Sequence, residues 1–315
     1  VALSGGWDNC VKVWDWKDSL AYARTLTGHT DRVEGVALDA AGGRAVTASR
    51  DCSVRVWDVL KGRQLSSIYT YDSLSCMAGA WATGCAVVGA RSGAVNFWSL
   101  DTGKKAHSLK GHVEEVTCLC LMAGAGSGEA VWVSGGADAN VRVWDVRAGR
   151  TVSLMSGCER KVLALAAVDY TLWAGDFSGS VKVFDIRNPT CGDAVVAEQP
   201  NAPLDGGVGS APIAGVCVSD DGCRIYSSAA AYWDEEDDDN DGPDGCIQVH
   251  ARNGFDGEYM YTLCTTGGLI SSISTRGDRL LAGHVGGGLF ACELSTAKKS
   301  NAAVWEADHI GCEPL

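Results

Sequence analysis

A short pattern recurs along the whole of this chain: an apolar residue, any residue, a second apolar residue and an aromatic residue. It is clearest between Gly28 and Asp58, where three runs of alternating apolar residues are separated by turns of Gly and Asp. Alternation with a period of two, interrupted by such turns, is typical of a short antiparallel sheet and not of a helix. A fourth run at Arg63–Tyr69 follows after Lys61-Gly62. The stretch therefore predicts one four-stranded sheet.

The end of this pattern returns at regular intervals along the chain. It lies at residues 14, 57, 98, 144 and 184, which are 43, 41, 46 and 40 residues apart. Two weaker copies, in which the aromatic residue is lost, have their last residues at 250 and 292. A single sheet of this size leaves a face uncovered, whereas repeats of this period cover each other's faces. We therefore expect an all-β fold, a seven-bladed β-propeller of four-stranded antiparallel blades, with ring closure involving the chain ends.

The dipeptides at the ends of the blades resemble those of a known family. Trp-Asp ends three of the third strands, Phe-Asp replaces it once, and Gly-His precedes two blades: Trp14-Asp15, Trp57-Asp58, Trp144-Asp145, Phe184-Asp185, Gly28-His29 and Gly111-His112. The sequence resembles the WD-repeat β-propeller family over nearly its whole length, without matching a particular member. The resemblance implies a propeller whose usual role is to bind other proteins.

We expect a single domain over residues 1–315. The predicted blades span residues 1–27, 28–70, 71–110, 111–156, 157–200, 201–265 and 266–307, with an acidic insertion at 232–245. The first blade lacks its innermost strand at the N-terminus, and because Val1 already lies in a predicted strand we expect the natural chain to begin upstream. A candidate closing strand lies at 308–315, where Asp308-His309 takes the place of a Gly-His dipeptide and Ile310-Gly311-Cys312 begins an apolar alternation. The alternative, a strand outside this sequence, stays open.

Charge and cysteine content restrict the class of protein. The formal net charge is −13, and eight of the negative charges lie in the acidic insertion. Binding to a nucleic acid backbone requires a clustered positive surface, so nucleic acid is not expected as a direct partner. Most of the 14 cysteines fall inside apolar strand runs, and no apolar run is long enough to span a membrane. We expect an intracellular, cytoplasmic protein without disulfides.

The resemblance also implies a buried chain of hydrogen bonds within a blade. In WD-repeat relatives it joins the His of Gly-His, a Ser or Thr of the second strand, the Asp of the next turn and the Trp of the third strand. By resemblance these are His29, Ser49, Asp51 and Trp57 in the second blade. The fourth blade keeps His112, Asp138 and Trp144 but has Gly136 in the predicted hydroxyl position. A buried polar chain is tolerated only when its members are satisfied, so its expected role is structural.

The acidic insertion carries a weak candidate for a metal site. Asp237, Asp239, Asp241 and Gly242 reproduce the opening of a calcium-binding loop, in which alternate carboxylates converge on the ion. The pattern is not completed, because Gln248 stands where an EF-hand needs Glu. A solvated loop of like charges is the expected alternative, and no metal or cofactor is predicted. The sequence also lacks the common catalytic motifs, so we expect no enzyme activity.

The turns between second and third strands offer a candidate binding face. The resemblance places all of these turns on one face of the disc, and their central residues are Trp7, Arg50, Arg91, Ala137 and Phe177. Aromatic residues and arginines are typical of interface hot spots. Arg50 and Arg91 lie on neighbouring blades, where together they could hold a carboxylate or phosphate. In the alternative, each arginine pairs with local acids and the aromatics cover strand ends.

Three functions remain at this point. The first is a non-enzymatic scaffold for protein or peptide partners, as a subunit of a larger assembly. The second is a substrate- or phosphopeptide-recognition subunit, for example of a ubiquitin ligase, with a dominant site near Arg50 and Arg91. The third is a calcium-dependent or catalytic propeller, which would use Asp237–Asp241.

Overall fold

The computed structural model describes thirteen segments of the chain, which are residues 1–15, 21–39, 43–81, 84–123, 130–187, 195–200, 212–219, 221–229, 245–253, 256–265, 270–277, 279–285 and 287–293. These residues form β-strands in seven antiparallel sheets and contain no α-helix. Within them, no helix is long and apolar enough to cross a membrane. The all-β fold class is thus confirmed.

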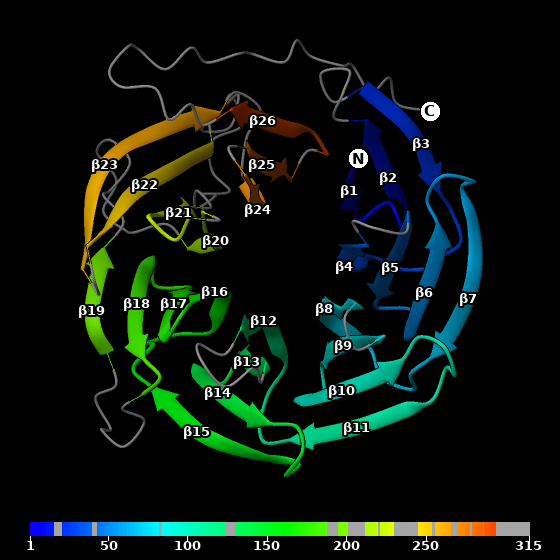
Figure 1. Ribbon diagram of the computed structural model, residues 1–315, viewed down its shortest axis with the longest axis horizontal. Coiled ribbons are helices and arrows are strands. Elements are labelled where there is room, and N and C mark those ends of the chain that lie inside the picture. Colours follow the sequence, from blue (N-terminus) through cyan, green and yellow to red (C-terminus); the bar gives the residue numbers. More distant parts are fainter. Residues whose placement is uncertain are drawn as a thin grey trace, which may run out of the picture.

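The seven sheets follow the order of the sequence around a common axis (Figure 1). The first three sheets consist of β1 (Ala2–Gly5), β2 (Val11–Asp15) and β3 (Ala21–Leu26); of β4 (Val33–Leu38), β5 (Arg44–Ser49), β6 (Ser53–Asp58) and β7 (Arg63–Tyr69); and of β8 (Leu74–Ala80), β9 (Cys85–Ala90), β10 (Ala94–Ser99) and β11 (Lys105–Lys110). In each complete sheet the first strand lies nearest the axis and the fourth forms the rim.

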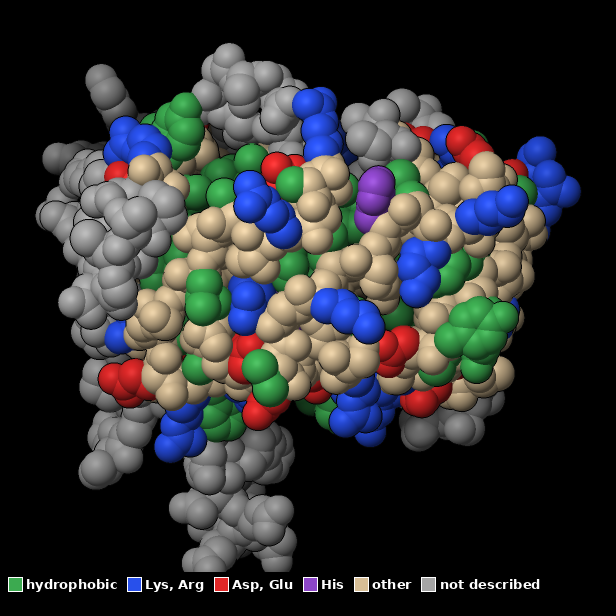
Figure 2. Space-filling model, turned by 90° about the horizontal axis from the view of Figure 1, so that it is seen from below, with side chains coloured by type: hydrophobic (Ala, Val, Ile, Leu, Met, Phe, Trp, Pro, Cys, Tyr) green, Lys and Arg blue, Asp and Glu red, His purple; other side chains and the backbone are tan. Residues whose placement is uncertain are grey.

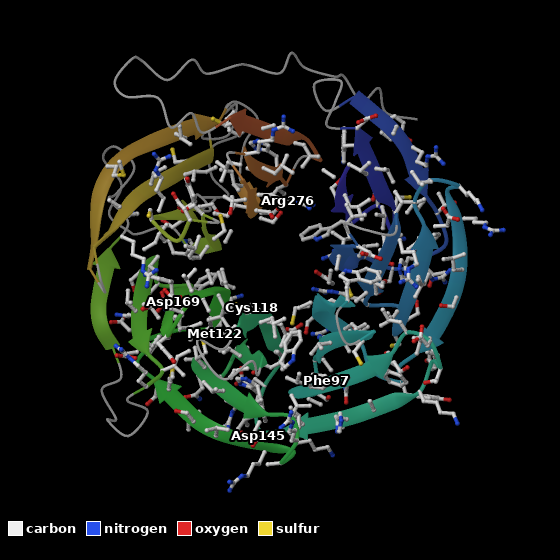
Figure 3. The ribbon with its side chains drawn as sticks, in the orientation of Figure 1. Phe97, Cys118, Met122, Asp145, Asp169 and Arg276 are labelled. Carbon is white, nitrogen blue, oxygen red and sulfur yellow. The ribbon has the colours of Figure 1, made fainter. Side chains whose placement is uncertain are left out.

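The remaining four sheets continue the ring. They consist of β12 (Val116–Ala123), β13 (Ala130–Gly136), β14 (Asn140–Asp145) and β15 (Arg150–Ser156); of β16 (Val162–Val168), β17 (Thr171–Asp176), β18 (Ser180–Asp185) and β19 (Val195–Pro200); of β20 (Ile213–Val218), β21 (Arg224–Ala229), β22 (Gly245–Asn253) and β23 (Asp256–Thr265); and of β24 (Ile270–Arg276), β25 (Arg279–His284) and β26 (Leu289–Glu293). Figure 3 shows Cys118 and Met122 on the inner strand β12 and Asp145 near the rim of the same blade.

A β-bulge recurs at one position of the third strand. It falls immediately before the aromatic residue, as between Val56 and Trp57 where β6 pairs with β7. The same shift precedes residues 14, 98, 144 and 184, and also His250, where the aromatic is lost. A bulge adds one residue to one strand and increases the local twist. Its recurrence shows that the weak sixth repeat has the same geometry as the others.

Neighbouring blades meet where an aliphatic residue of one inner strand covers a small residue of the preceding blade. A Cβ atom added to Gly135 would lie 2.7 Å from Val162 Cγ1, and one added to Gly89 would lie 2.8 Å from Val116 Cγ1. Val116 and Val162 are completely buried. Such close approach leaves no room for a side chain, because protein interiors are packed to crystal-like density. This contact locks each blade to the next.

Two of the sheets have three described strands instead of four. The first sheet begins with β1, which occupies the place of a second strand, so its innermost position is empty of described residues. The seventh sheet ends with β26, which occupies the place of a third strand. Residues 294–315, which include the end of the predicted seventh blade and the predicted closing strand at 308–315, lie outside the described residues. So does nearly all of the acidic insertion, including Asp237, Asp239 and Asp241.

The packing between blades predicts the effect of a single methyl group. We expect Gly135→Ala to lower the free energy of unfolding by about 1–3 kcal/mol, because the new Cβ overlaps Val162 and Cys118. Gly288→Ala is the matched control, since a Cβ added there would meet nothing closer than 4.0 Å. Chemical denaturation measures both variants. Equal stability of the two variants would contradict this account of blade packing.

Candidate functional site

A buried relay of hydrogen bonds crosses the second blade. Trp57 Nε1 donates to Thr47 Oγ1 at 2.9 Å, and Thr47 Oγ1 lies 2.7 Å from His29 Nε2. His29 Nδ1 lies 2.8 Å from Asp51 Oδ2. Because the carboxylate only accepts, Nδ1 carries the ring proton and Nε2 accepts from the Thr47 hydroxyl. Every member is thereby satisfied, and the relay ties the second and third strands to the loop that enters the blade.

The fourth blade repeats this relay. Trp144 Nε1 donates to Ser134 Oγ at 2.7 Å, Ser134 Oγ lies 2.7 Å from His112 Nε2, and His112 Nδ1 lies 2.9 Å from Asp138 Oδ1. A serine, a histidine and an aspartate in this order also form the catalytic triad of serine hydrolases. Ser134 is completely buried and already accepts the Trp144 N–H, so its hydroxyl cannot reach a substrate. The arrangement serves blade structure.

The hydroxyl of this relay was expected at Ser49, and the structure places it two residues earlier. Ser49 Oγ donates to the carbonyl of Asp31 and accepts from the amide of Asp51, so it supports the turn instead of the tryptophan. Trp57 pairs with Ala45 across the strands, and its indole N–H reaches only to the next residue on the same face, Thr47. The expectation that the fourth blade lacks a hydroxyl was wrong for the same reason, because Ser134 supplies it.

The relay is incomplete in other blades. Trp14 Nε1 in the first blade donates to Ser4 Oγ at 2.9 Å, which reproduces the tryptophan–hydroxyl contact. In the third blade Val88 stands opposite Asn96, where a hydroxyl would be needed, and the buried Trp98 Nε1 has no hydrogen-bond partner among the described residues. Blades therefore differ in how strongly their strands are tied together.

Burial sets the protonation of the relay. It lowers the pKa of His29 and His112, although Asp51 and Asp138 act in the opposite direction, so both imidazoles are neutral near pH 7. Burial alone would raise the pKa of Asp51. Hydrogen bonds from Ser53 and His29 outweigh it and hold that pKa below its ordinary value. The relay is thus a neutral imidazole beside a carboxylate.

The turns between second and third strands share one backbone geometry in five blades. Each turn has one residue with a left-handed backbone, which lies two positions before the first valine of the third strand. These residues are Asn9, Cys52, Gly93, Ala139 and Gly179. The amide of the central turn residue also donates to the carbonyl just before the inner strand, as from Arg50 to Arg32 at 3.0 Å and from Phe177 to Lys161 at 3.0 Å. Equivalent turns thus stand at equivalent places around the ring.

The side chains on these turns pair with neighbours. Arg32 lies over the ring of Trp7, with its guanidinium carbon 3.9 Å from the ring centre, and Trp7 is 68% exposed. Lys161 lies over Phe177 at 4.6 Å. Both contacts are cation–π pairs, which hold an aromatic side chain in one orientation at the surface. Arg32 and Lys161 were not predicted; their only sequence signal is their position directly before an inner strand.

Arg50 and Arg91 are engaged by different carboxylates. Arg50 Nε donates to Glu34 Oε1, and Arg91 Nε lies 3.7 Å from Glu115 Oε1. A phosphate held jointly by these arginines would lie close to both glutamates, which already engage the Nε atoms. The arrangement corresponds to the alternative in which each arginine pairs with a local acid. We call the set Trp7, Arg32, Arg50, Arg91, Lys161 and Phe177 the turn face.

Comparison with known proteins identifies related repeats. The family model described as WD domain, G-beta repeat, matches residues 1–15, 21–58 and 103–145. These segments contain the Trp-Asp dipeptides of three blades and the paired histidine relays. The matched segments are WD repeats, and over them the chain is similar to WD-repeat proteins. The third, fifth and sixth blades share the strand order and the bulge position but lack the Trp-Asp dipeptide.

Relatives are distant and longer than the matched region. The nuclear distribution protein nudF of Aspergillus niger is 28% identical over 49% of this chain and 39% of its own length. The methylosome protein WDR77 of Xenopus laevis is 24% identical over 46% of this chain and 45% of its own. The small ribosomal subunit protein RACK1 of Caenorhabditis elegans is 30% identical over 35% of this chain and 33% of its own. The chain therefore spans less than half the length of these WD-repeat relatives.

Two tryptophans test the relay. We expect Trp57→Phe to reduce the free energy of unfolding by about 1–3 kcal/mol more than Trp98→Phe, because only Trp57 donates a buried hydrogen bond. Both side chains are buried at the same position of their blades, so the loss of packing is comparable. Urea denaturation of both variants provides the measurement. A larger loss for Trp98→Phe would refute the structural role of the relay.

Stability should fall as the pH is lowered. The pKa of His29 and His112 is below 6.5 in the folded chain, so the unfolded chain binds more protons as the pH drops through 6.5. Asp51 and Asp138 add to the loss below 3.8, because their folded pKa is also depressed. We expect the melting temperature to decline from about pH 7 to about pH 5, and less steeply in His29→Asn with His112→Asn. A flat wild-type profile would contradict this assignment.

Proposed function

We propose that this WD-repeat chain is a non-enzymatic platform for protein–protein interactions and a subunit of a larger assembly. The observation that carries the proposal is the turn face, above all the exposed Trp7 held by Arg32. Aromatic and arginine side chains dominate interface hot spots. Because the turns are held by backbone hydrogen bonds before any partner arrives, little ordering entropy is lost on binding.

The rim supplies a second surface. Val152 and Leu154 point outward from β15 and are 61% and 48% exposed, beside Arg150. Figure 2 looks at one side of the disc, where Lys and Arg side chains are spread among apolar ones. Tyr69 and Tyr71 pack edge to face at 4.8 Å, and both are exposed. Several separate surfaces suit a scaffold better than a receptor with a single site.

The names of two relatives support a role in an assembly. One is a methylosome protein and another a protein of the small ribosomal subunit. For this chain we propose protein or peptide partners within the cell, in the cytoplasm. Direct binding of nucleic acid is not part of the proposal, because the net charge is −13.

The alternative of a phosphopeptide-recognition subunit has less support. Glu34 and Glu115 lie beside Arg50 and Arg91, and their carboxylates would repel a phosphate that approached these arginines. Non-enzymatic function is likewise a proposal. It is supported by the structural use of Ser134, His112 and Asp138, which leaves this triad-like group out of reach of a substrate.

Affinity capture from the native source tests the platform. We expect the wild-type chain to retain a stoichiometric set of proteins, identified by mass spectrometry. Trp7→Ala with Phe177→Ala should remove the partners of the turn face, because it deletes both aromatic anchors without touching the relay. Val152→Ser with Leu154→Ser is the matched rim control. Capture of no stoichiometric partner by the wild-type chain would overturn the proposal. Equal loss of partners in both variants would contradict a main contact on the turn face alone.

A further inference from the structure

An exposed pair of aromatic side chains lies where the second blade passes into the third. Tyr69 ends the outer strand β7, and Tyr71 lies in the connection to the inner strand β8. Their rings pack edge to face with centroids 4.8 Å apart, and the two residues are 57% and 85% exposed. The amide of Arg91 donates to the carbonyl of Ser73 at 3.0 Å, so this connection lies beside the turn face. We call Tyr69 and Tyr71 the tyrosine pair, a candidate anchor because tyrosine is enriched in interface hot spots.

The backbone holds the tyrosine pair in one place. Thr70, between the two tyrosines, is buried, and its amide donates to the carbonyl of Cys52 at 2.8 Å. Its hydroxyl lies 2.9 Å from the carbonyl oxygens of both Cys52 and Asp72. Tyr71 has a left-handed backbone with a φ of 63°, a conformation that a residue with a side chain keeps only where its surroundings fix it. The exposed rings are therefore ordered before a partner arrives, which reduces the entropy lost on binding.

Carboxylates gather around the same turn. Burial raises the pKa of the Cys52 thiol above its ordinary value, and three nearby carboxylates raise it further. They belong to Asp51, Asp72 and Asp31. Asp51 is paired with His29, but within the described residues neither Asp31 nor Asp72 forms an ion pair. Each of these two accepts a hydrogen bond from an uncharged donor, a backbone amide for Asp31 and a serine hydroxyl for Asp72. Two uncompensated negative charges therefore lie beside the tyrosine pair.

The aromatic side chains of the turn face already have a cation, whereas the tyrosine pair has none. Arg32 lies over the ring of Trp7 at 3.9 Å, and Lys161 lies over Phe177 at 4.6 Å. In the part of the chain that the structure describes, no lysine or arginine lies over either ring of the tyrosine pair. The arginines of the two adjoining turns are paired with glutamates. The site is thus complementary to a positive charge that the described residues do not supply.

We propose that the tyrosine pair, together with Asp31 and Asp72, recognises a lysine or arginine side chain on an extended segment of a partner protein. The cation lies over an exposed tyrosine ring, and the two carboxylates offset its charge. The same carboxylates repel an acidic or phosphorylated segment. The inference rests on the proposed platform function for the kind of partner, and it adds the charge that this partner presents between the second and third blades.

An array of short peptides tests the charge of the partner segment. The array holds heptapeptides with arginine, lysine, glutamine or glutamate at the centre and randomised flanking residues, and it is probed with the full chain near physiological ionic strength. We expect the arginine and lysine peptides to retain at least about tenfold more of the wild-type chain than the glutamine peptides, and the glutamate peptides to retain least. Equal retention by arginine and glutamine centres, or retention by none of the peptides, would overturn the inference.

Substitution of the tyrosine pair separates a cation–π contact from a simple apolar contact. Tyr69→Leu with Tyr71→Leu should reduce the preference for arginine about tenfold, because leucine keeps an apolar surface but has no π system. Tyr69→Phe with Tyr71→Phe is the matched control and should keep the preference. Both tyrosines are exposed, so the melting temperature should be the same in the two variants. A preference for arginine that survives in the leucine variant would contradict recognition at this site.

Neutralising the carboxylates separates this site from attraction by the net charge of −13. Asp31→Asn with Asp72→Asn should reduce the retention by arginine peptides about fivefold. Asp101→Asn with Glu159→Gln is the matched control, since it removes the same charge from two exposed residues elsewhere and should have little effect. Equal loss in both variants would assign the preference to net charge and overturn the inference. Partners that are still captured by a wild-type chain without any arginine preference would contradict this inference alone and leave the platform standing.

Discussion

The structure depends on one contact that recurs around the ring: an aliphatic residue of an inner strand packed on a small residue, most often glycine, in the preceding blade. Gly135 and Val162 approach so closely that even a methyl group would overlap. Each blade is a thin sheet that cannot bury both faces alone, so its stability comes from its neighbours. The position of every turn, and hence of every residue on the turn face, follows from this packing.

The hydrogen-bonded relays act within blades rather than between them. In the second and fourth blades a tryptophan, a hydroxyl, a histidine and an aspartate hold the strands and the entering loop in a fixed relation. The third blade lacks the hydroxyl, and its Trp98 is held by packing and by Lys105, whose ammonium lies 5.5 Å from the ring centre. The blades are thus unequal, and we expect the second and fourth blades, which have complete relays, to preserve the geometry of the blades without one. That geometry is what makes the loops rigid enough to serve as a binding surface.

The turn face has little unpaired charge. Its cations lie on aromatic rings or beside carboxylates, as with Arg32 on Trp7 and Arg50 beside Glu34. A surface of this kind favours a partner that covers exposed aromatic area over one that brings a dense negative charge. This property distinguishes a protein-binding platform from a phosphate-reading site built from the same residue types.

The sequence by itself determined the blade count, the strand order and the family, because the period and alternation of the repeats are set by local backbone geometry and by the need to cover both faces of each sheet. It also identified His29, Asp51, His112 and Asp138. Only the tertiary structure showed that Thr47 and Ser134 are the bridging hydroxyls, since this depends on how far the indole N–H reaches across paired strands. The partners of Arg50 and Arg91 were likewise decided in three dimensions, because Glu34 and Glu115 are brought to them by strand pairing and by the neighbouring blade.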